Sequence, residues 1–135
     1  MERTYTTPLL DKLGIRPGMR VGLAGFGPAV LDDELTGLTA RTSDITLGEP
    51  RDGTDVVLFA AESPAELESL ARLRGSIKPN GAIWIVSRKG KAATLRYAEL
   101  LEAARAAGLV DNKVASFSAT HTALRFVIPV ALRPR

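Results

Sequence analysis

Residues 20–29 read Arg-Val-Gly-Leu-Ala-Gly-Phe-Gly-Pro-Ala, and this stretch decides the fold class. Its first half is a short, mostly apolar run of the kind that forms a buried strand, and its second half is a glycine-rich turn. A short helix over about residues 28–35 is expected next, because Pro28 suits the first turn of a helix. A strand that turns through glycines into a helix is the opening unit of an α/β sheet.

Two further strand–helix units follow along the chain. Each begins with a continuous apolar run and goes on to a helical segment: strands at 55–60 and 82–87, helices at about 63–75 and 94–107. Ser63-Pro64-Ala65-Glu66 is a capping box with proline at the first helical position, and Pro79-Asn80-Gly81 is a turn before the second run. Strands that alternate with helices predict a parallel sheet with right-handed crossovers.

The two ends of the chain and its middle depart from this alternation. Residues 7–14 predict an entry helix that Thr7 caps, and Pro17-Gly18 makes a turn after it. Residues 38–42 have the composition of a short strand, whereas 48–53 are turn-rich and predict a loop. Two strand-like runs close the chain and predict an antiparallel hairpin: residues 114–119 and 123–130.

Together these elements predict one domain with a three-layer, Rossmann-like α/β fold, a mostly parallel sheet and a C-terminal antiparallel hairpin. The domain spans residues 1–135: the entry helix and turn 1–18, the strand–helix units 19–110, and the terminal hairpin 111–135. A chain of this length, 45% apolar and 24% charged, buries enough surface to fold without disulfides or metals.

Residue usage excludes several kinds of site. The chain has no cysteine and a single histidine, His121, which excludes disulfides, thiolate catalysis and a Cys/His metal centre, so no metal is expected. The sequence has no apolar run long enough to span a membrane and a polar start unlike a signal peptide, which predicts a cytoplasmic location without membrane attachment. Trp84 is expected in the core, and His121 on an exposed hairpin turn.

Charge is distributed unevenly along the chain. Residues 1–68 hold 6 Lys/Arg and 12 Asp/Glu, whereas residues 69–135 hold 12 Lys/Arg and 3 Asp/Glu. Seven basic residues lie between 69 and 98 with no acidic one among them: Arg72, Arg74, Lys78, Arg88, Lys89, Lys91 and Arg96. This segment is either a solvated basic face or a field that attracts phosphate or an acidic partner. Aromatic residues are only 5% of the chain and do not interleave with the basic ones, so nucleic-acid binding is not expected.

The glycine turn is the first candidate site. Gly25 and Gly27 would let a nucleotide or a carboxylate approach the backbone at the start of a helix, although a tight strand-to-helix turn also favours glycine without any ligand. Asp44 follows Gly25 by 19 residues, near the spacing expected for a carboxylate that binds ribose at the end of the second strand. Ser-Asp before a loop is equally ordinary turn chemistry.

A second candidate lies after the strand that contains Trp84. Arg88, Lys89 and Lys91 follow its carboxyl end, the edge where open parallel sheets bind ligands, and they form either an anion site or a solvated loop. The segment lacks the phosphate-binding pattern of a Walker loop. The acidic cluster Asp32-Asp33-Glu34 is interpreted as a solvated helix face.

The order of these landmarks resembles that of class I S-adenosylmethionine-dependent methyltransferases, over roughly residues 13–130. The resemblance rests on four stretches: Leu13-Gly14-Ile15-Arg16-Pro17-Gly18-Met19-Arg20-Val21, Gly25-Phe26-Gly27, Asp55-Val56-Val57-Leu58 and Ile77-Lys78-Pro79-Asn80-Gly81-Ala82-Ile83-Trp84. It implies a Rossmann-like fold and S-adenosylmethionine as the cofactor.

A second resemblance covers nearly the whole chain and is to a bacterial family of short proteins known only as a domain of unknown function. It rests on Thr7-Pro8-Leu9, Lys12-Leu13-Gly14-Ile15, Pro17-Gly18, the Trp84 strand, Gly108-Leu109-Val110-Asp111, Lys113-Val114 and Leu124-Arg125-Phe126-Val127. This resemblance implies no particular activity.

Two functions from different classes follow. The leading one is a non-catalytic binding or accessory module that recognises an unknown protein or small molecule through its basic segment. The alternative is a minimal S-adenosylmethionine- or nucleotide-dependent transferase, in which Gly25, Gly27 and Asp44 contact the ligand and residues 88–91 cover the acceptor or a phosphate. The exposed edge of the hairpin favours a homodimer in either case.

Overall fold

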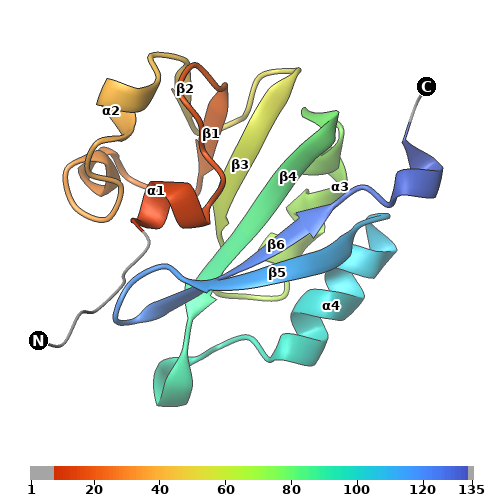
Figure 1. The fold of residues 1–135 in the computed structure, drawn as a ribbon. Helices are drawn as coiled ribbons and strands as arrows, with labels where there is room; N and C mark the ends of the chain where they lie inside the picture. The colour runs from red at the N-terminus through yellow and green to blue at the C-terminus, as the bar shows by residue number, and fades with distance from the viewer. Residues whose placement is uncertain (1–7, 134–135) are drawn as a thin grey trace, which may run out of the picture.

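The computed structural model describes residues 8–133, and its strands form one six-stranded sheet in the order β2-β1-β3-β4-β6-β5 (Figure 1). The strands are β1 Val21–Ala24, β2 Ile45–Leu47, β3 Thr54–Ala60, β4 Ile77–Arg88, β5 Val110–Ser116 and β6 His121–Val127. Strands β1 to β4 pair in parallel, whereas β6 pairs antiparallel with both β4 and β5. The predicted fold class, including the terminal hairpin, is confirmed.

Helical elements cover both faces of the sheet and complete three layers (Figure 1). One face carries α1 Leu9–Lys12, the 3-10 helix η1 Pro28–Leu31 and α2 Leu38–Arg41; the other carries the 3-10 helix η2 Glu66–Ser69, α3 Leu70–Arg74 and α4 Tyr97–Ala106. Two further 3-10 helices are η3 Gly90–Ala92 and η4 Val130–Leu132. Neither has a buried residue, and neither belongs to the two helical layers. None of the helices in residues 8–133 is both long and apolar enough to cross a membrane.

Strand β4 joins the two halves of the core because it is buried on both faces. Ile83 and Ile85 pack in the cluster beneath α3 and α4, while Trp84 and Val86 pack in the cluster beneath α1 and α2. Trp84 is fully buried, as expected, and its indole Nε1–H donates a hydrogen bond of 3.0 Å to the carbonyl of Leu13 at the end of α1. This bond fixes the N-terminal helix on the sheet.

The middle of the chain differs from its prediction. Residues 38–42 were expected as a strand, but Leu38–Arg41 form α2, and the second strand is Ile45–Leu47. Gly37, at φ 92°, turns the chain into α2, and the Arg41 guanidinium donates to the Ile15 carbonyl at 2.9 Å and to Asp11 at 2.7 Å. These contacts tie α2 to the end of α1, and neither is visible in a local sequence pattern.

Two smaller predictions are also corrected. Pro79-Asn80-Gly81 is not a turn before a strand: it lies inside β4, where the register jumps from Thr54↔Ile77 to Val56↔Ala82 and the extra residues bulge out of the sheet. The helix expected from residue 94 begins at Tyr97, because Arg96 has extended dihedral angles and its backbone N–H donates to Glu99 at 2.8 Å. Thr7, the predicted cap of the entry helix, lies outside the described residues.

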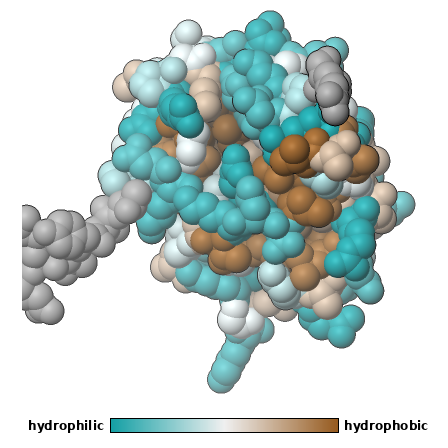
Figure 2. All heavy atoms as spheres, turned by 45° about the vertical axis from the view of Figure 1, so that its right-hand side comes forward, coloured by the Kyte–Doolittle hydropathy of each residue, from teal (hydrophilic) through white to brown (hydrophobic). Residues whose placement is uncertain are grey.

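Large apolar side chains reach the surface near the C-terminal end of the fold. Val114 of β5 is 60% exposed and Val130 of η4 is 75% exposed, with Val110 and Leu132 also exposed. The face turned forward in Figure 2 shows apolar patches between polar side chains. Strand β5 is an edge of the sheet, and the homodimer predicted from this edge stays a prediction.

The Trp84 contact yields a first prediction. Trp84→Phe removes the donor to the buried Leu13 carbonyl, and an unpaired buried acceptor costs about 1–3 kcal/mol, to which the lost side-chain volume adds. Urea unfolding followed by circular dichroism should therefore show a lower free energy of unfolding. The matched control is Tyr97→Phe at an exposed position, where a change within about 0.5 kcal/mol is expected. Equal stability of both variants would contradict the role assigned to Trp84.

Candidate functional site

The sheet order places a topological switch point between β1 and β3. From β1 the chain crosses to β2 on one side and then returns to β3 on the other side of β1. In open α/β sheets the loops on the two sides of such a point separate, and ligands bind in the crevice beyond the carboxyl ends of the strands. Here the glycine turn after β1 and the segment after β3 border that crevice.

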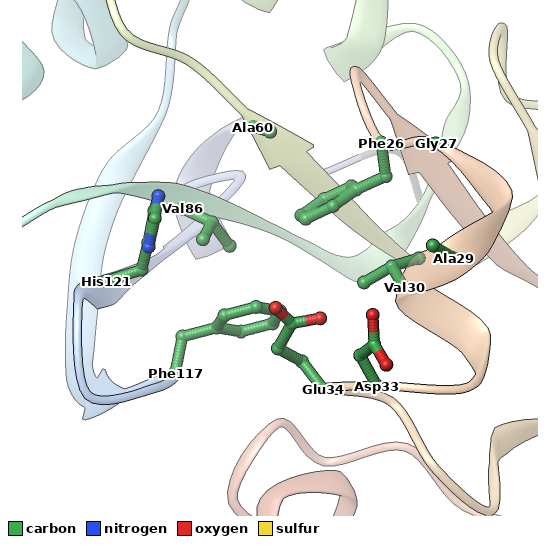
Figure 3. Close-up of a pocket in the computed structure, with 10 residues that line it drawn as sticks. All are labelled: Phe26, Gly27, Ala29, Val30, Asp33, Glu34, Ala60, Val86, Phe117 and His121. Atoms are coloured by element: carbon green, nitrogen blue, oxygen red, sulfur yellow. The ribbon is translucent and has the colours of Figure 1, made fainter.

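A cavity of about 310 Å³ lies at this point (Figure 3). Its walls come from the glycine turn, from η1 and the residues after it, from the ends of β3 and β4, and from the hairpin. Asp33 and Glu34 point their carboxylates into the cavity, and the rings of Phe26 and Phe117 reach it from two sides. The two ring centroids are 5.9 Å apart at an interplanar angle of 35°. The volume lies at the lower end of the range for small-molecule sites.

The two glycines of the turn have different roles. Gly25 has φ +83°, and a Cβ built on it would lie 2.7 Å from the backbone oxygen of Ala60, so this glycine is required by the close approach of β1 and β3. Gly27 has an extended φ of −82°, its added Cβ would meet nothing within 4 Å, and it lines the cavity. Of the two predicted ligand-binding glycines, Gly27 lines the cavity and Gly25 is not among its lining residues.

Asp44 does not join this site. It immediately precedes β2, and its carbonyl accepts a hydrogen bond of 2.9 Å from the N–H of Val21, the first residue of β1. The glycine turn lies at the opposite end of β1, about 13 Å away along four residues. The predicted ribose contact required Asp44 at the carboxyl edge of the sheet, whereas the second strand follows Asp44 and leaves it at the amino edge. The first carboxylate beyond the carboxyl end of β2 is Glu49, which pairs with Arg72 at 2.7 Å.

At the amino edge Asp44 instead belongs to a network of ion pairs. The Arg20 Nε is 2.9 Å from Asp44, and Arg51 approaches the same carboxylate at 3.2 Å. Asp55 accepts a hydrogen bond of 2.9 Å from the Arg20 backbone N–H and pairs with Lys78 at 2.9 Å. Burial opposes ionisation of Asp55, but the Arg20 N–H together with the charges of Lys78 and Arg20 outweighs it and lowers the pKa of this carboxyl group.

Arg88, Lys89 and Lys91 do come together at the carboxyl edge, where they line a second cavity of about 490 Å³. Arg88 is the last residue of β4, and its Nε lies 3.8 Å from Glu62. The Lys89 Nζ donates to the hydroxyl of Ser116 at 2.9 Å. The three predicted residues therefore lie together, and anion binding by them stays a prediction.

The basic segment between residues 69 and 98 is not one surface. Lys78 lies at the amino end of β4 and Arg88 at its carboxyl end, so the two occupy opposite edges of the sheet. Arg72 lies on α3 and is held by Glu49. The structure therefore divides the predicted basic field, and residues 88–91 are the part of it that lies near the cavity at the switch point.

His121 was expected on an exposed turn but is the first residue of β6, with 31% of its side chain exposed. Its Nδ1 is 2.7 Å from the hydroxyl of Thr120, and its Nε2 is 3.7 Å from a carboxylate oxygen of Glu62. The side chain lines both cavities. An imidazole with a carboxylate beside it is able to accept or donate a proton for a bound ligand.

Several cavity residues were missed by sequence reasoning. Asp33 and Glu34 are exposed as predicted for a solvated helix face, but both also line the cavity. Their position directly after the short helix that follows the glycine turn is a local signal that could have identified them. Phe117 offered no such signal, because the hairpin brings it to the glycine turn from 90 residues away in the sequence.

Comparison with known proteins identifies the family of the chain and its fold. The family model described as "Protein of unknown function (DUF3052)" matches residues 10–130. No curated protein sequence matches the chain. Similar solved structures are S-adenosylmethionine-dependent methyltransferases or related proteins, at sequence identities that establish the fold alone.

Three of these structures cover most of the chain. A TehB-like S-adenosylmethionine-dependent methyltransferase from Corynebacterium glutamicum has a TM-score of 0.59 and 14% identity, covering 89% of this chain and 85% of that one. Magnesium protoporphyrin IX methyltransferase from Synechocystis, with S-adenosylmethionine bound, has 0.61 and 13%, covering 89% and 74%. Aeropyrum pernix fibrillarin, with natively bound S-adenosylmethionine, has 0.56 and 14%, covering 90% and 69%.

These findings bear differently on the two predicted functions. The methyltransferase-like fold predicted from the resemblance is confirmed. The leading prediction of a non-catalytic accessory module finds no support in the comparisons, whereas the transferase alternative agrees with them at the level of the fold.

The contrast between the two glycines is testable. Gly25→Ala places a Cβ against the Ala60 carbonyl and requires a left-handed backbone, so we expect it to destabilise the protein by at least about 1–2 kcal/mol. Gly27→Ala has room and an ordinary backbone, and it should leave stability unchanged or raise it by about 0.4–1 kcal/mol. Thermal and urea unfolding of the two variants provide the measurement, and the opposite order would refute the assignment.

The lowered pKa of Asp55 predicts that the free energy of unfolding depends on pH. Because its pKa is lowered in the folded state, its ionised form adds stability above the ordinary aspartate pKa of about 3.9, and this contribution is lost as pH falls through the folded-state pKa. Urea midpoints measured from pH 6 downward should therefore fall less steeply for Asp55→Asn than for the wild type. Asp52→Asn, at an exposed neighbour, should follow the wild-type curve.

Proposed function

The chain belongs to the family described as Protein of unknown function (DUF3052), and we propose that it binds S-adenosylmethionine in the cavity at the switch point and works as a small methyltransferase. The observation that carries the proposal is the chemistry of that cavity. Two carboxylates, two phenyl rings and an unobstructed glycine gather where the fold places its ligand crevice. The similarity to methyltransferase structures supports the same reading.

The charge of the cavity selects among ligands. The described residues that line it include Asp33 and Glu34 but no lysine or arginine. A negative site of this kind repels phosphate and attracts a cation, and aromatic faces add to the attraction. The sulfonium and ammonium groups of S-adenosylmethionine are cations, and its adenine is a flat ring that packs on phenyl groups. The residues present therefore fit this ligand better than a nucleotide polyphosphate.

The chain's own residues each have a task in this proposal. Gly27 lets the ligand approach the backbone, Asp33 and Glu34 bind its positive charge, and Phe26 and Phe117 exclude water from it. When bound, S-adenosylmethionine supplies an activated methyl group. His121, with Glu62 at 3.7 Å, is the imidazole in the cavity wall and is placed to act as a general base.

Two variants with different effects test this proposal. Isothermal titration should show that Asp33→Asn/Glu34→Gln weakens binding of S-adenosylmethionine by about tenfold but leaves the affinity for uncharged methylthioadenosine nearly unchanged. Gly27→Val should weaken the binding of both ligands, because the valine side chain enters the cavity. The control is Asp32→Asn, since Asp32 is exposed and does not line the cavity. The proposal would be refuted if the wild type bound neither compound, or if the control lost as much affinity for S-adenosylmethionine as the double variant.

A further inference from the structure

Two cavities of opposite charge meet at His121. The first, of about 310 Å³, contains Asp33 and Glu34; the second, of about 490 Å³, contains Arg88, Lys89 and Lys91. His121 is the residue that lines both. A ligand in either cavity would therefore lie beside His121.

The second cavity has an excess of positive charge. Its described lining residues include three cationic side chains and no carboxylate. Glu62 approaches Arg88 at 3.8 Å, and Lys89 bonds a neutral hydroxyl, that of Ser116. Lys91 makes no ion pair or side-chain hydrogen bond within residues 8–133, so of the three cations only Arg88 has a carboxylate beside it. An oxyanion would supply the missing negative charge through charge-assisted hydrogen bonds.

The backbone holds this cluster in place. Arg88 pairs in register with His121 across β4 and β6, and the N–H of Lys89 donates a hydrogen bond of 3.0 Å to the Thr120 carbonyl. The loop after β4 is thus fixed to the hairpin, and its cations are directed to one cavity rather than spread over a flexible segment. A binding site that is already formed loses less entropy when a ligand arrives.

We propose that the second cavity binds the oxyanion of a small second substrate, a carboxylate or a phosphate, and presents the rest of that molecule to His121. This inference rests on the proposed function, because the molecule is a second substrate only if the first cavity holds the methyl donor. Opposite charges keep the two ligands apart: the anionic molecule is repelled by Asp33 and Glu34, and the cationic donor is repelled by the cations of the second cavity. The substrate class is therefore a small acid rather than a neutral or basic compound.

The single histidine allows a direct test. Protein labelled selectively at histidine gives one imidazole signal, that of His121, which reports on both cavities. Titration with inorganic phosphate and, separately, with citrate should shift this signal saturably. Comparison of the two affinities then distinguishes a phosphate site from a carboxylate site. Arg88→Gln/Lys91→Gln should weaken that binding by about tenfold or more while leaving the affinity for S-adenosylmethionine nearly unchanged. Lys91→Gln alone, at an exposed position, repeats the test in a variant with little risk of unfolding.

The matched control is Arg105→Gln/Lys113→Gln, which removes the same charge from α4 and β5. No saturable shift in either titration, or an equal loss of affinity in the control, would overturn the inference. The two proposals fail separately: if S-adenosylmethionine does not bind but the anion shift still depends on Arg88 and Lys91, the proposed function is wrong and the oxyanion site stands. If S-adenosylmethionine binds and the anions do not, the oxyanion site is wrong.

Discussion

The burial of β4 on both faces is the constraint on which the other elements depend. Its residues alternate between the two core clusters, and Trp84 additionally binds the Leu13 carbonyl. β3 and β6 pair with β4 on its two sides, and helices cover it above and below. The position of the carboxyl ends of β1, β3 and β4, and with it the place of both cavities, follows from that arrangement.

Parallel strands then separate the chemistry of the two edges. At the amino edge Arg20, Asp44, Asp55 and Lys78 neutralise one another in closed ion pairs. At the carboxyl edge Asp33 and Glu34 line one cavity, and Arg88, Lys89 and Lys91 line the other with Glu62 3.8 Å from Arg88. Both edges are rich in charged residues, but the cavities in which we propose ligand binding lie at the carboxyl edge.

The sequence was informative where the signal is local. Apolar runs identified β3 and the central part of β4, glycine and proline marked the turn after β1, and the alternation of elements predicted the parallel sheet. The three-residue β2 carries too little pattern to be distinguished from its surroundings, which is why Asp44 was placed at the wrong edge. Contacts between distant segments, such as Phe26 with Phe117 and His121 with Glu62, depend on how the hairpin docks, and no spacing along the chain encodes them.

The hydrogen bond from the Lys89 N–H to the Thr120 carbonyl makes the hairpin a common wall of both cavities. A displacement of that wall changes the shape of the two together. If both cavities bind ligands as proposed, both ligands contact this shared wall, and any factor by which one changes the affinity of the other is reciprocal. Any coupling between the two proposed ligands would then pass through the residues from Thr120 to His121, without a moving domain.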